Sequence, residues 1–353
     1  MEVRTWLRQA ILAGAPPHTA PAAPDPPDAA WETVLPVARQ EGMAGLLFCA
    51  LRNRDRLGAL PPDTRRAFEA AYYQTLAATT LAVAEGARVQ QAWSDSGIAS
   101  VSMKGVALAA TIYADAGRRP LGDLDLLVAP DDFAAAERAL AKLGYAILPH
   151  YAQRGPHRAL AERAYLRATP PRMQLDLHCA PWSRPAVNAP ELSAWLWAHT
   201  TTVATPAGSL RTFDATGQLL HVALHAAFQD GQRGRLIRLY DLALLLTGTT
   251  CDWNALAAIA RAARIAPALA RVLQTAAATW SIALPADVAR LDRPDMPVRA
   301  RCALLSVRTP AVRWLVDGLA LDTPQATLAA WAGALAPDAS YRQWRRDVKR
   351  RRR

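Results

Sequence analysis

The chain has 353 residues, of which 52% are apolar, so it can bury a sizeable core and is long enough for two domains or for one domain with a large helical extension. The formal net charge is +11, and residues 341–353 account for +7 of it, so the rest of the chain is only mildly basic. The four cysteines form no CxxC pair, which excludes a zinc ribbon or a thioredoxin-like motif and is typical of a reduced, cytoplasmic protein.

The sequence also argues against export and against membrane insertion. No apolar run approaches the roughly 18 residues that a membrane span requires. A short apolar stretch near the N-terminus is interrupted by Arg8, so we predict no signal peptide.

Helical patterns dominate the first part of the chain. Residues 3–14 have the spacing of a short amphipathic helix, whereas residues 15–30 contain six prolines and predict an extended linker. From Trp31 to about Arg54 the apolar spacing is helical again, with a break or kink expected at Pro36. A long helix then begins after Pro61 and ends near Gly97.

Between residues 98 and about 180 the pattern changes to short strands alternating with helices. We predict strands at 98–104, 123–128, 145–150, 164–169 and 172–179, with helical segments at 105–117 and 129–145. Pro170 and Pro171 separate the last two strands, which favours an antiparallel pair.

From Asp214 onward helical spacing continues to the end of the chain. The candidate helices are 214–229, 233–247, 252–265, 267–281, 295–307, 309–319 and 324–336. We therefore predict an α+β fold with a small mixed sheet. Its parts are an N-terminal helical region (1–97), an α/β catalytic domain (98–213), a C-terminal helical domain (214–339) and a basic tail (340–353).

Two aspartates stand out in the predicted strand "GDLDLLV". Residues i and i+2 of a strand point to the same face, so Asp123 and Asp125 project together while Leu124 and Leu126 project to the other side. Burying two unpaired carboxylates side by side costs several kcal/mol, roughly, and a divalent cation such as Mg²⁺ removes that cost. The alternative is an edge strand whose polar face is in contact with water.

A third carboxylate favours the metal site. Asp176 lies in "MQLDLH", another predicted strand, where it shares a face with Gln174 and His178. Three carboxylates on neighbouring strands are the ligands of a two-metal site, which stabilises the attacking and leaving oxygens of phosphoryl transfer.

Phosphate-binding residues accompany the acids. Lys104 and Gly105 lie where a strand passes into a helix, and a glycine there lets a phosphate approach the free N–H groups of the helix N-terminus. Arg118 and Arg119 directly precede the acidic strand and can reach a phosphate chain.

The run "MKGVALAATIYADAGRRPLGDLDLLVAPDDFAAAERALAKLGY", with "QLDLH" downstream, resembles the nucleotidyltransferase superfamily, and within it the bacterial branch usually labelled "uncharacterised nucleotidyltransferase". The resemblance covers residues 98–180 and extends to about residue 265. It implies Gly105 as the phosphate turn, Asp123 and Asp125 as the acidic pair and Asp176 as the third acid. It also implies Mg²⁺ as cofactor, an NTP as co-substrate and transfer of a nucleoside monophosphate with release of pyrophosphate.

The sequence departs from that superfamily in two respects. The usual Gly-Ser or Gly-Gly turn is Lys104-Gly105-Val106 here, without a serine hydroxyl for the phosphates, and the gap from Gly105 to Asp123 is longer than in typical members. A non-catalytic protein of the same fold, binding RNA or a protein partner, is therefore the alternative prediction.

The acceptor stays open between RNA, a small molecule, a peptide and a protein. The basic tail (340–353) can bind nucleic acid by charge alone, or it can be a solvated terminus.

Three further residues are candidates for the surroundings of the site. His221 and His225 stand at i and i+4 in "HVALH", a spacing compatible with zinc, but the glutamate of a HExxH protease is missing. They are expected to be polar core residues or to line the cleft beside His178 and the acids. Asp241 lies in an apolar helical run and needs a partner such as Arg238 or a histidine; it serves either as a brace between helices or as a substrate contact.

Overall fold

The computed structural model describes residues 3–14, 31–148, 162–182, 184–230, 235–289, 291, 296–307, 309–319, 325 and 327–328. The proline-rich linker (15–30) and the basic tail (340–353) lie outside the described residues, as does most of the helix expected at 324–336. No helix among the described residues is long and apolar enough to cross a membrane.

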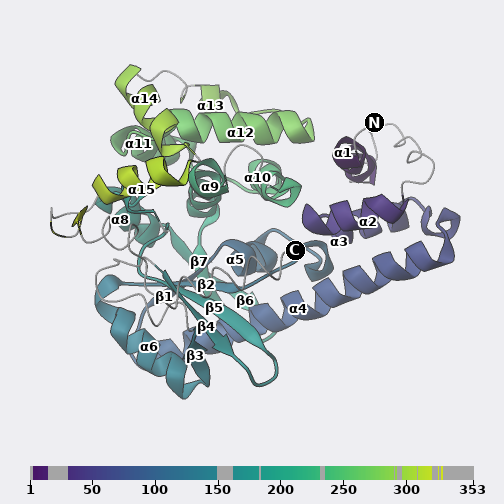
Figure 1. Cartoon of the computed structure of the whole chain (residues 1–353), viewed down its shortest axis with the longest axis horizontal. Helices are drawn as coiled ribbons and strands as arrows, with labels where there is room; N and C mark the ends of the chain where they lie inside the picture. Colours follow the sequence, from purple (N-terminus) through teal and green to yellow (C-terminus); the bar gives the residue numbers. More distant parts are fainter. Residues whose placement is uncertain are drawn as a thin grey trace.

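A mixed sheet forms the centre of the fold (Figure 1). Its strands are β1 (Ser100–Met103), β2 (Leu124–Val128), β3 (Tyr145–Ile147), β4 (Glu162–Arg167), β5 (Met173–His178), β6 (Thr200–Thr205) and β7 (Gly208–Phe213). They follow the order β3-β4-β5-β2-β1-β7-β6. The pairs β2–β5 and β1–β7 are parallel and the other pairs are antiparallel, including the predicted pair β4–β5.

Alternation along β2 gives the sheet two different faces. Leu124, Leu126 and Val128 belong to a core beneath the sheet, which α4 (Pro62–Ser94) and α6 (Phe133–Lys142) cover. Leu127 belongs to the core on the other face, where Asp125 also projects. The predicted separation of Asp125 from Leu124 and Leu126 is confirmed, because a strand alternates its side chains.

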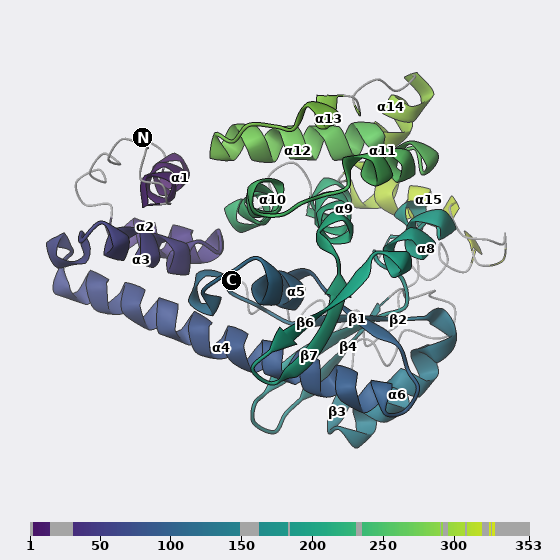
Figure 2. The ribbon, with the colours of Figure 1, turned by 180° about the vertical axis from the view of Figure 1, so that it is seen from behind.

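The N-terminal helices pack at one end of the long helix α4 (Figures 1 and 2). They are α1 (Val3–Gly14), α2 (Trp31–Gln40) and α3 (Ala44–Asn53), and the 3-10 turn η1 (Leu57–Ala59) leads from α3 to α4. Proline at the first position of α4 costs no hydrogen bond, and Asp63 complements the helix dipole there.

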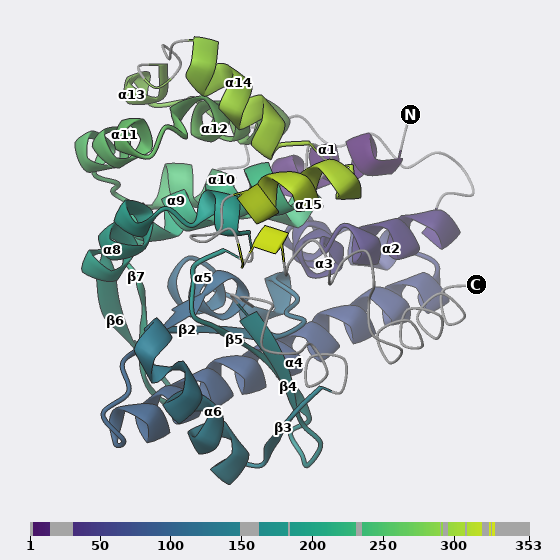
Figure 3. The same cartoon turned by 60° about the vertical axis from the view of Figure 1, so that its left-hand side comes forward.

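The second half of the chain is mostly helical and stacks above the sheet (Figure 3). Its helices are α8 (Pro190–Ala198), α9 (Ala215–His225), α10 (Leu236–Gly248), α11 (Trp253–Ala262), α12 (Ala266–Trp280), α13 (Ala286–Ala289), α14 (Met296–Leu305) and α15 (Pro310–Leu319). The 3-10 turn η4 (Pro185–Val187) precedes α8, and a π-helical turn, η5 (Ala226–Asp230), follows α9. This region shares one core with the N-terminal helices, so the domain limits at 97 and 213 stay a prediction.

Two local features differ from the sequence analysis. The break expected at Pro36 is absent, since α2 continues through this proline, and the helix ends instead before Gly42, whose positive φ of 74° suits glycine. No strand was predicted between residues 200 and 213, yet β6 and β7 form a hairpin in which Gly208 has a φ of 126°. β6 consists mainly of threonine and alanine and is largely exposed, so it lacks the apolar alternation that identifies a strand.

A short turn, η2 (Ala116–Arg118), is held tightly between α3 and α4. A Cβ added to Gly45 of α3 would lie 1.9 Å from the carbonyl oxygen of Gly117, and one added to Gly117 would lie 2.3 Å from the ring of Tyr72. Only glycine permits this close approach. The N-terminal helices therefore fix the loop that leads from α5 (Lys104–Thr111) to the acidic strand β2.

The first prediction concerns this contact. Gly45→Ala should destabilise the protein by about 1–3 kcal/mol, because the backbone of Gly117 must move to admit the new methyl group. Gly58→Ala is the matched control, since a Cβ at Gly58 meets no atom within 4 Å. Urea unfolding measures both; equal stability of the two variants would contradict the close approach.

Candidate active site

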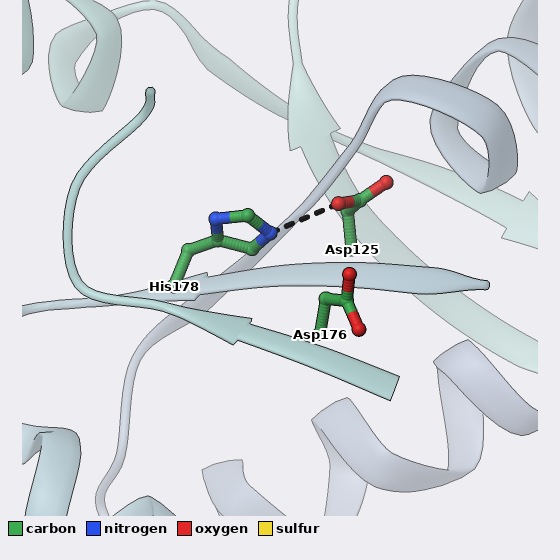
Figure 4. Close-up of side chains that lie close together, drawn as sticks. All are labelled: Asp125, Asp176 and His178. Carbon is green, nitrogen blue, oxygen red and sulfur yellow. Dashed lines mark hydrogen bonds and ion pairs between the residues drawn. The ribbon is translucent and has the colours of Figure 1, made fainter. Parts of the chain in front are cut away.

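Parallel pairing of β2 with β5 places two acids side by side. Asp125 stands opposite Asp176 in the register, and both project from the same face of the sheet. His178, two residues further along β5, joins them, so that one ligand atom from each of these side chains lies within 4.8 Å of the others. Figure 4 shows the imidazole pointing to the Asp125 carboxylate, with Asp176 beside it. The three side chains form a candidate metal centre.

Two cationic or proton-donating groups contact Asp125, which is only 5% exposed. The Lys104 ammonium lies 2.6 Å from its Oδ1 atom, and the His178 Nε2 atom lies 2.9 Å from the same oxygen. An ionised carboxylate only accepts hydrogen bonds, so His178 donates from Nε2. Its Nδ1 atom lies 3.6 Å from Glu162 on the adjacent strand β4.

These contacts divide the acids into two kinds. Burial alone would raise the pKa of Asp125, but Lys104 and His178 outweigh it and hold that pKa well below its usual range. Burial and the negative charge of Asp125 raise the pKa of Asp123 to about 7 and that of Asp176 to about 6. Asp125 is thus charged without a metal ion, whereas a bound metal ion would stabilise the charged forms of Asp123 and Asp176.

A cavity of about 340 Å³ opens beside Asp123 and Asp125. Lys104 and Gly105 line one part of it, and Arg235 and Arg238 at the start of α10 line another. Asp123 precedes β2 and is not one of the three side chains whose ligand atoms cluster, so the sheet itself brings together Asp125, Asp176 and His178.

The backbone of Lys104 is unusual. Its φ of 51° lies in the left-handed region, which costs a residue with a side chain roughly 1–2 kcal/mol. This conformation turns the chain from β1 directly into α5 and directs the ammonium group to Asp125. Strain of this kind is typical of functional sites.

Arg119 and Asp241 form a buried ion pair at the wall of the cavity. The guanidinium donates from Nε and Nη2 to the two carboxylate oxygens at 2.9 and 2.8 Å, and the Tyr113 hydroxyl donates to Asp241 at 2.7 Å. The hydrogen-bonding partners of Asp241 thus include Arg119 and Tyr113, two residues that the sequence did not suggest for this role. The pair links α10 to the loop before β2, and a Cβ on Gly105 would lie 2.9 Å from Nη1 of Arg119.

The other predicted residues are not members of the cluster formed by Asp125, Asp176 and His178. Arg118 forms an ion pair with Asp115 and is not among the described residues that line the cavity. His221 donates from Nε2 to the carbonyl of Pro181, and burial with the charge of Lys104 lowers its pKa to about 3. His225 does line the cavity, where Arg238 donates to its Nδ1 atom at 3.4 Å.

Three side chains of the site were not predicted in these roles. Glu162 approaches His178 across the strand pair β4–β5, and it was missed because β4 begins two residues before the predicted strand 164–169. Arg235 and Arg238 line the cavity from α10. Arg238 and Asp241 share a helical face at i and i+3, which was a usable signal for Arg238.

The residues present fit a divalent cation. Carboxylate oxygens are the preferred ligands of Mg²⁺, and Asp125 and Asp176 offer them from adjacent strands. His178 already donates a hydrogen bond to Asp125, which suits a residue that orients a ligand rather than binds the ion directly.

Comparison with known proteins identifies the family. The sequence model of a family described as "Uncharacterised nucleotidyltransferase" matches residues 27–281, which is more than half of the chain. The chain belongs to this family. The matched residues of this nucleotidyltransferase include the acidic strands β2 and β5, the cavity beside them and the helices α9 to α12.

A solved structure resembles this nucleotidyltransferase family member in part. It is an antigenic nucleotidyltransferase-like protein from Paracoccidioides brasiliensis, with 15% sequence identity and a TM-score of 0.35. The similarity covers 57% of this chain and 94% of that chain. No curated protein matches the sequence.

The second prediction follows from the raised pKa of Asp123. Its native pKa of about 7 exceeds the ordinary value of 3.8, so the folded protein binds more protons than the unfolded chain between these values, and stability falls as pH rises through that range. Asp123→Asn removes the buried charge. In metal-free buffer it should stabilise the protein by about 1–2 kcal/mol more at pH 8 than at pH 5, allowing for partial solvent screening.

Urea unfolding at both pH values measures this difference. Asp95→Asn, at an exposed aspartate after α4, is the control and should show no such dependence on pH. A gain for Asp123→Asn that is the same at pH 5 and pH 8 would show that the Asp123 carboxylate is not desolvated.

Proposed function

We propose that the protein is a Mg²⁺-dependent nucleotidyltransferase that transfers a nucleoside monophosphate from an NTP to a hydroxyl-bearing acceptor. The observation that carries this proposal is the register of β2 and β5, which sets Asp176 beside Asp125, and Asp125 lines a cavity rich in basic side chains. Family membership supports the same chemistry.

The acids would bind the metal ions, and one of them would accept the proton of the acceptor hydroxyl. Asp123 and Asp125 would bind the ions with the nucleotide, and Asp176 would complete the site. Divalent cations at such a site stabilise the attacking and leaving oxygens of an in-line displacement. A carboxylate oxygen of Asp176 would accept the proton of the acceptor hydroxyl.

One bond to the α-phosphorus forms and one breaks during the transfer. The acceptor oxygen forms a bond to the α-phosphorus, and the bond between that phosphorus and the oxygen bridging to the β-phosphate breaks. The bonding pair leaves with pyrophosphate, and the proton of the acceptor goes to Asp176.

Basic groups around the cavity would neutralise the triphosphate. Lys104 contacts Asp125 without a nucleotide, and its flexible ammonium can turn to a phosphate once a cation compensates that acid. Arg119 donates from Nε and Nη2 to Asp241. Its Nη1 group, which lies beside Gly105, would donate a hydrogen bond to a phosphate oxygen of the substrate. Arg118, bound to Asp115, would act only on the outer part of a substrate.

One observation favours the alternative, a non-catalytic protein of this fold that binds RNA or a protein partner. Lys104 and His178 already compensate the charge of Asp125, so the fold does not require a metal ion there. This alternative predicts that Mg²⁺ with ATP leaves the melting temperature unchanged. A rise that is lost in Asp125→Asn would exclude it.

The third prediction tests the transfer itself. With α-labelled NTPs, Mg²⁺ and cell extract, the wild-type protein should label an acceptor and release pyrophosphate. Asp125→Asn and Asp176→Asn should each lower the rate by about 100-fold or more, the usual cost of losing a group that stabilises transition-state charge or moves a proton. Asp95→Asn is again the control.

The labelling experiment has one result that would overturn the site assignment. If Asp125→Asn or Asp176→Asn labels as strongly as the wild type, these carboxylates do not hold the reacting groups. Adding excess chelator to the wild type should abolish labelling as well, because no protein cation can replace the metal at both oxygens of the displacement.

A further inference from the structure

A second cavity lies behind the proposed nucleotide cavity, among the C-terminal helices. It measures about 390 Å³ and is enclosed by η5, α10, α12 and the end of α14. Ala226, Leu239 and Val272 give it an apolar lining, and Thr275 and Ser306 add hydroxyl groups. This size is within the range of about 300–1,000 Å³ that small-molecule sites occupy.

Arg238 connects this second cavity to the first. It is the one described residue that lines both, so the two cavities adjoin at Arg238 of α10. His225, which accepts a hydrogen bond from Arg238, lines the first cavity together with Asp123 and Asp125. A ligand in the second cavity would therefore lie next to the acidic site.

The charged side chains that line the second cavity are basic. Arg238 and Arg271 line it, and none of its described lining residues is acidic. Burial lowers the pKa of Arg238, because the low-polarity surroundings disfavour its charged form. Guanidinium groups bind carboxylates and phosphates in two-point geometry. The chemistry thus suits a molecule with an anionic head and an apolar body.

We propose that the second cavity is the acceptor site and that the acceptor is a small molecule carrying a carboxylate or phosphate group. This inference rests on the proposed function. Arg271 and Arg238 would hold the anionic group, while the apolar lining covers the body and directs a hydroxyl across Arg238 to the side of Asp125 and Asp176. That hydroxyl oxygen is the one that attacks the α-phosphorus.

The fourth prediction uses probes that need neither Mg²⁺ nor a nucleotide. Isothermal titration should show binding of phenyl phosphate and benzoate, which combine an anionic head with an apolar ring, while benzyl alcohol binds about tenfold more weakly or not at all. Whichever anion binds more tightly distinguishes a phosphate-bearing acceptor from a carboxylate-bearing one. Inorganic phosphate should bind weakly, because it lacks the apolar body.

Variants locate the binding. Arg271 is exposed, so Arg271→Gln should fold normally and weaken phenyl phosphate or benzoate binding by about tenfold. Arg261→Gln, at an exposed arginine of α11 that lines neither cavity, is the matched control and should bind as the wild type does. Because Arg271→Lys keeps the charge but loses the two-point geometry, it should bind more weakly than the wild type and more tightly than Arg271→Gln. Unchanged binding in Arg271→Gln, or equal binding of benzyl alcohol, would overturn the proposal.

A second readout distinguishes this acceptor from RNA or protein. The labelled product from cell extract should pass an ultrafilter that retains macromolecules and should resist ribonuclease, and removal of residues 340–353 should not change its yield. Product retained by the filter would overturn the small-molecule acceptor while leaving the nucleotidyltransferase intact. Conversely, probe binding without any labelling would remove the proposed function and leave only a binding cavity.

Discussion

The repulsion between acids on neighbouring parallel strands is the constraint on which the site depends. Register places Asp125 beside Asp176, and Asp123 adds a third carboxylate at the cavity wall. A fold can tolerate this only by supplying positive charge or by leaving some of the acids protonated. Lys104 and His178 stabilise the charge of Asp125, and the raised pKa values of the other two acids show that their compensation is incomplete.

The surrounding structure keeps this unfavourable arrangement in place. Close contact of Gly45 with Gly117 anchors the loop before β2 on the N-terminal helices. The buried pair of Arg119 and Asp241 ties the same loop to α10 in the C-terminal helices. The acidic strand is thus held by both the N-terminal and the C-terminal helices, which also share one core because α1 packs directly against α12. Preorganisation of this kind lets a site retain charges that water would otherwise solvate.

Much of the fold was predictable because its signals are local. The strands around residues 100–103 and 124–128 and the pair at 162–178 appear close to their expected positions. Helix starts at Asp214 and Asp252 follow from side chains that cap the helix N-terminus, which is a property of neighbouring residues. The hairpin at 200–213 was missed because its first strand is exposed and carries no apolar alternation, so neither face of it is marked in the sequence.

The sequence alone determined the acids, the glycine turn and the family resemblance, since i, i+2 spacing fixes which side chains share a strand face. Only the tertiary structure decided which partners these residues have. Lys104 contacts an acid, Arg119 is bound to Asp241, and Arg238 lies between two cavities. Lys104 and Asp125 are 21 positions apart in the sequence, and Arg119 and Asp241 are 122 positions apart. Such contacts depend on how the helices pack against the sheet, which no local pattern encodes.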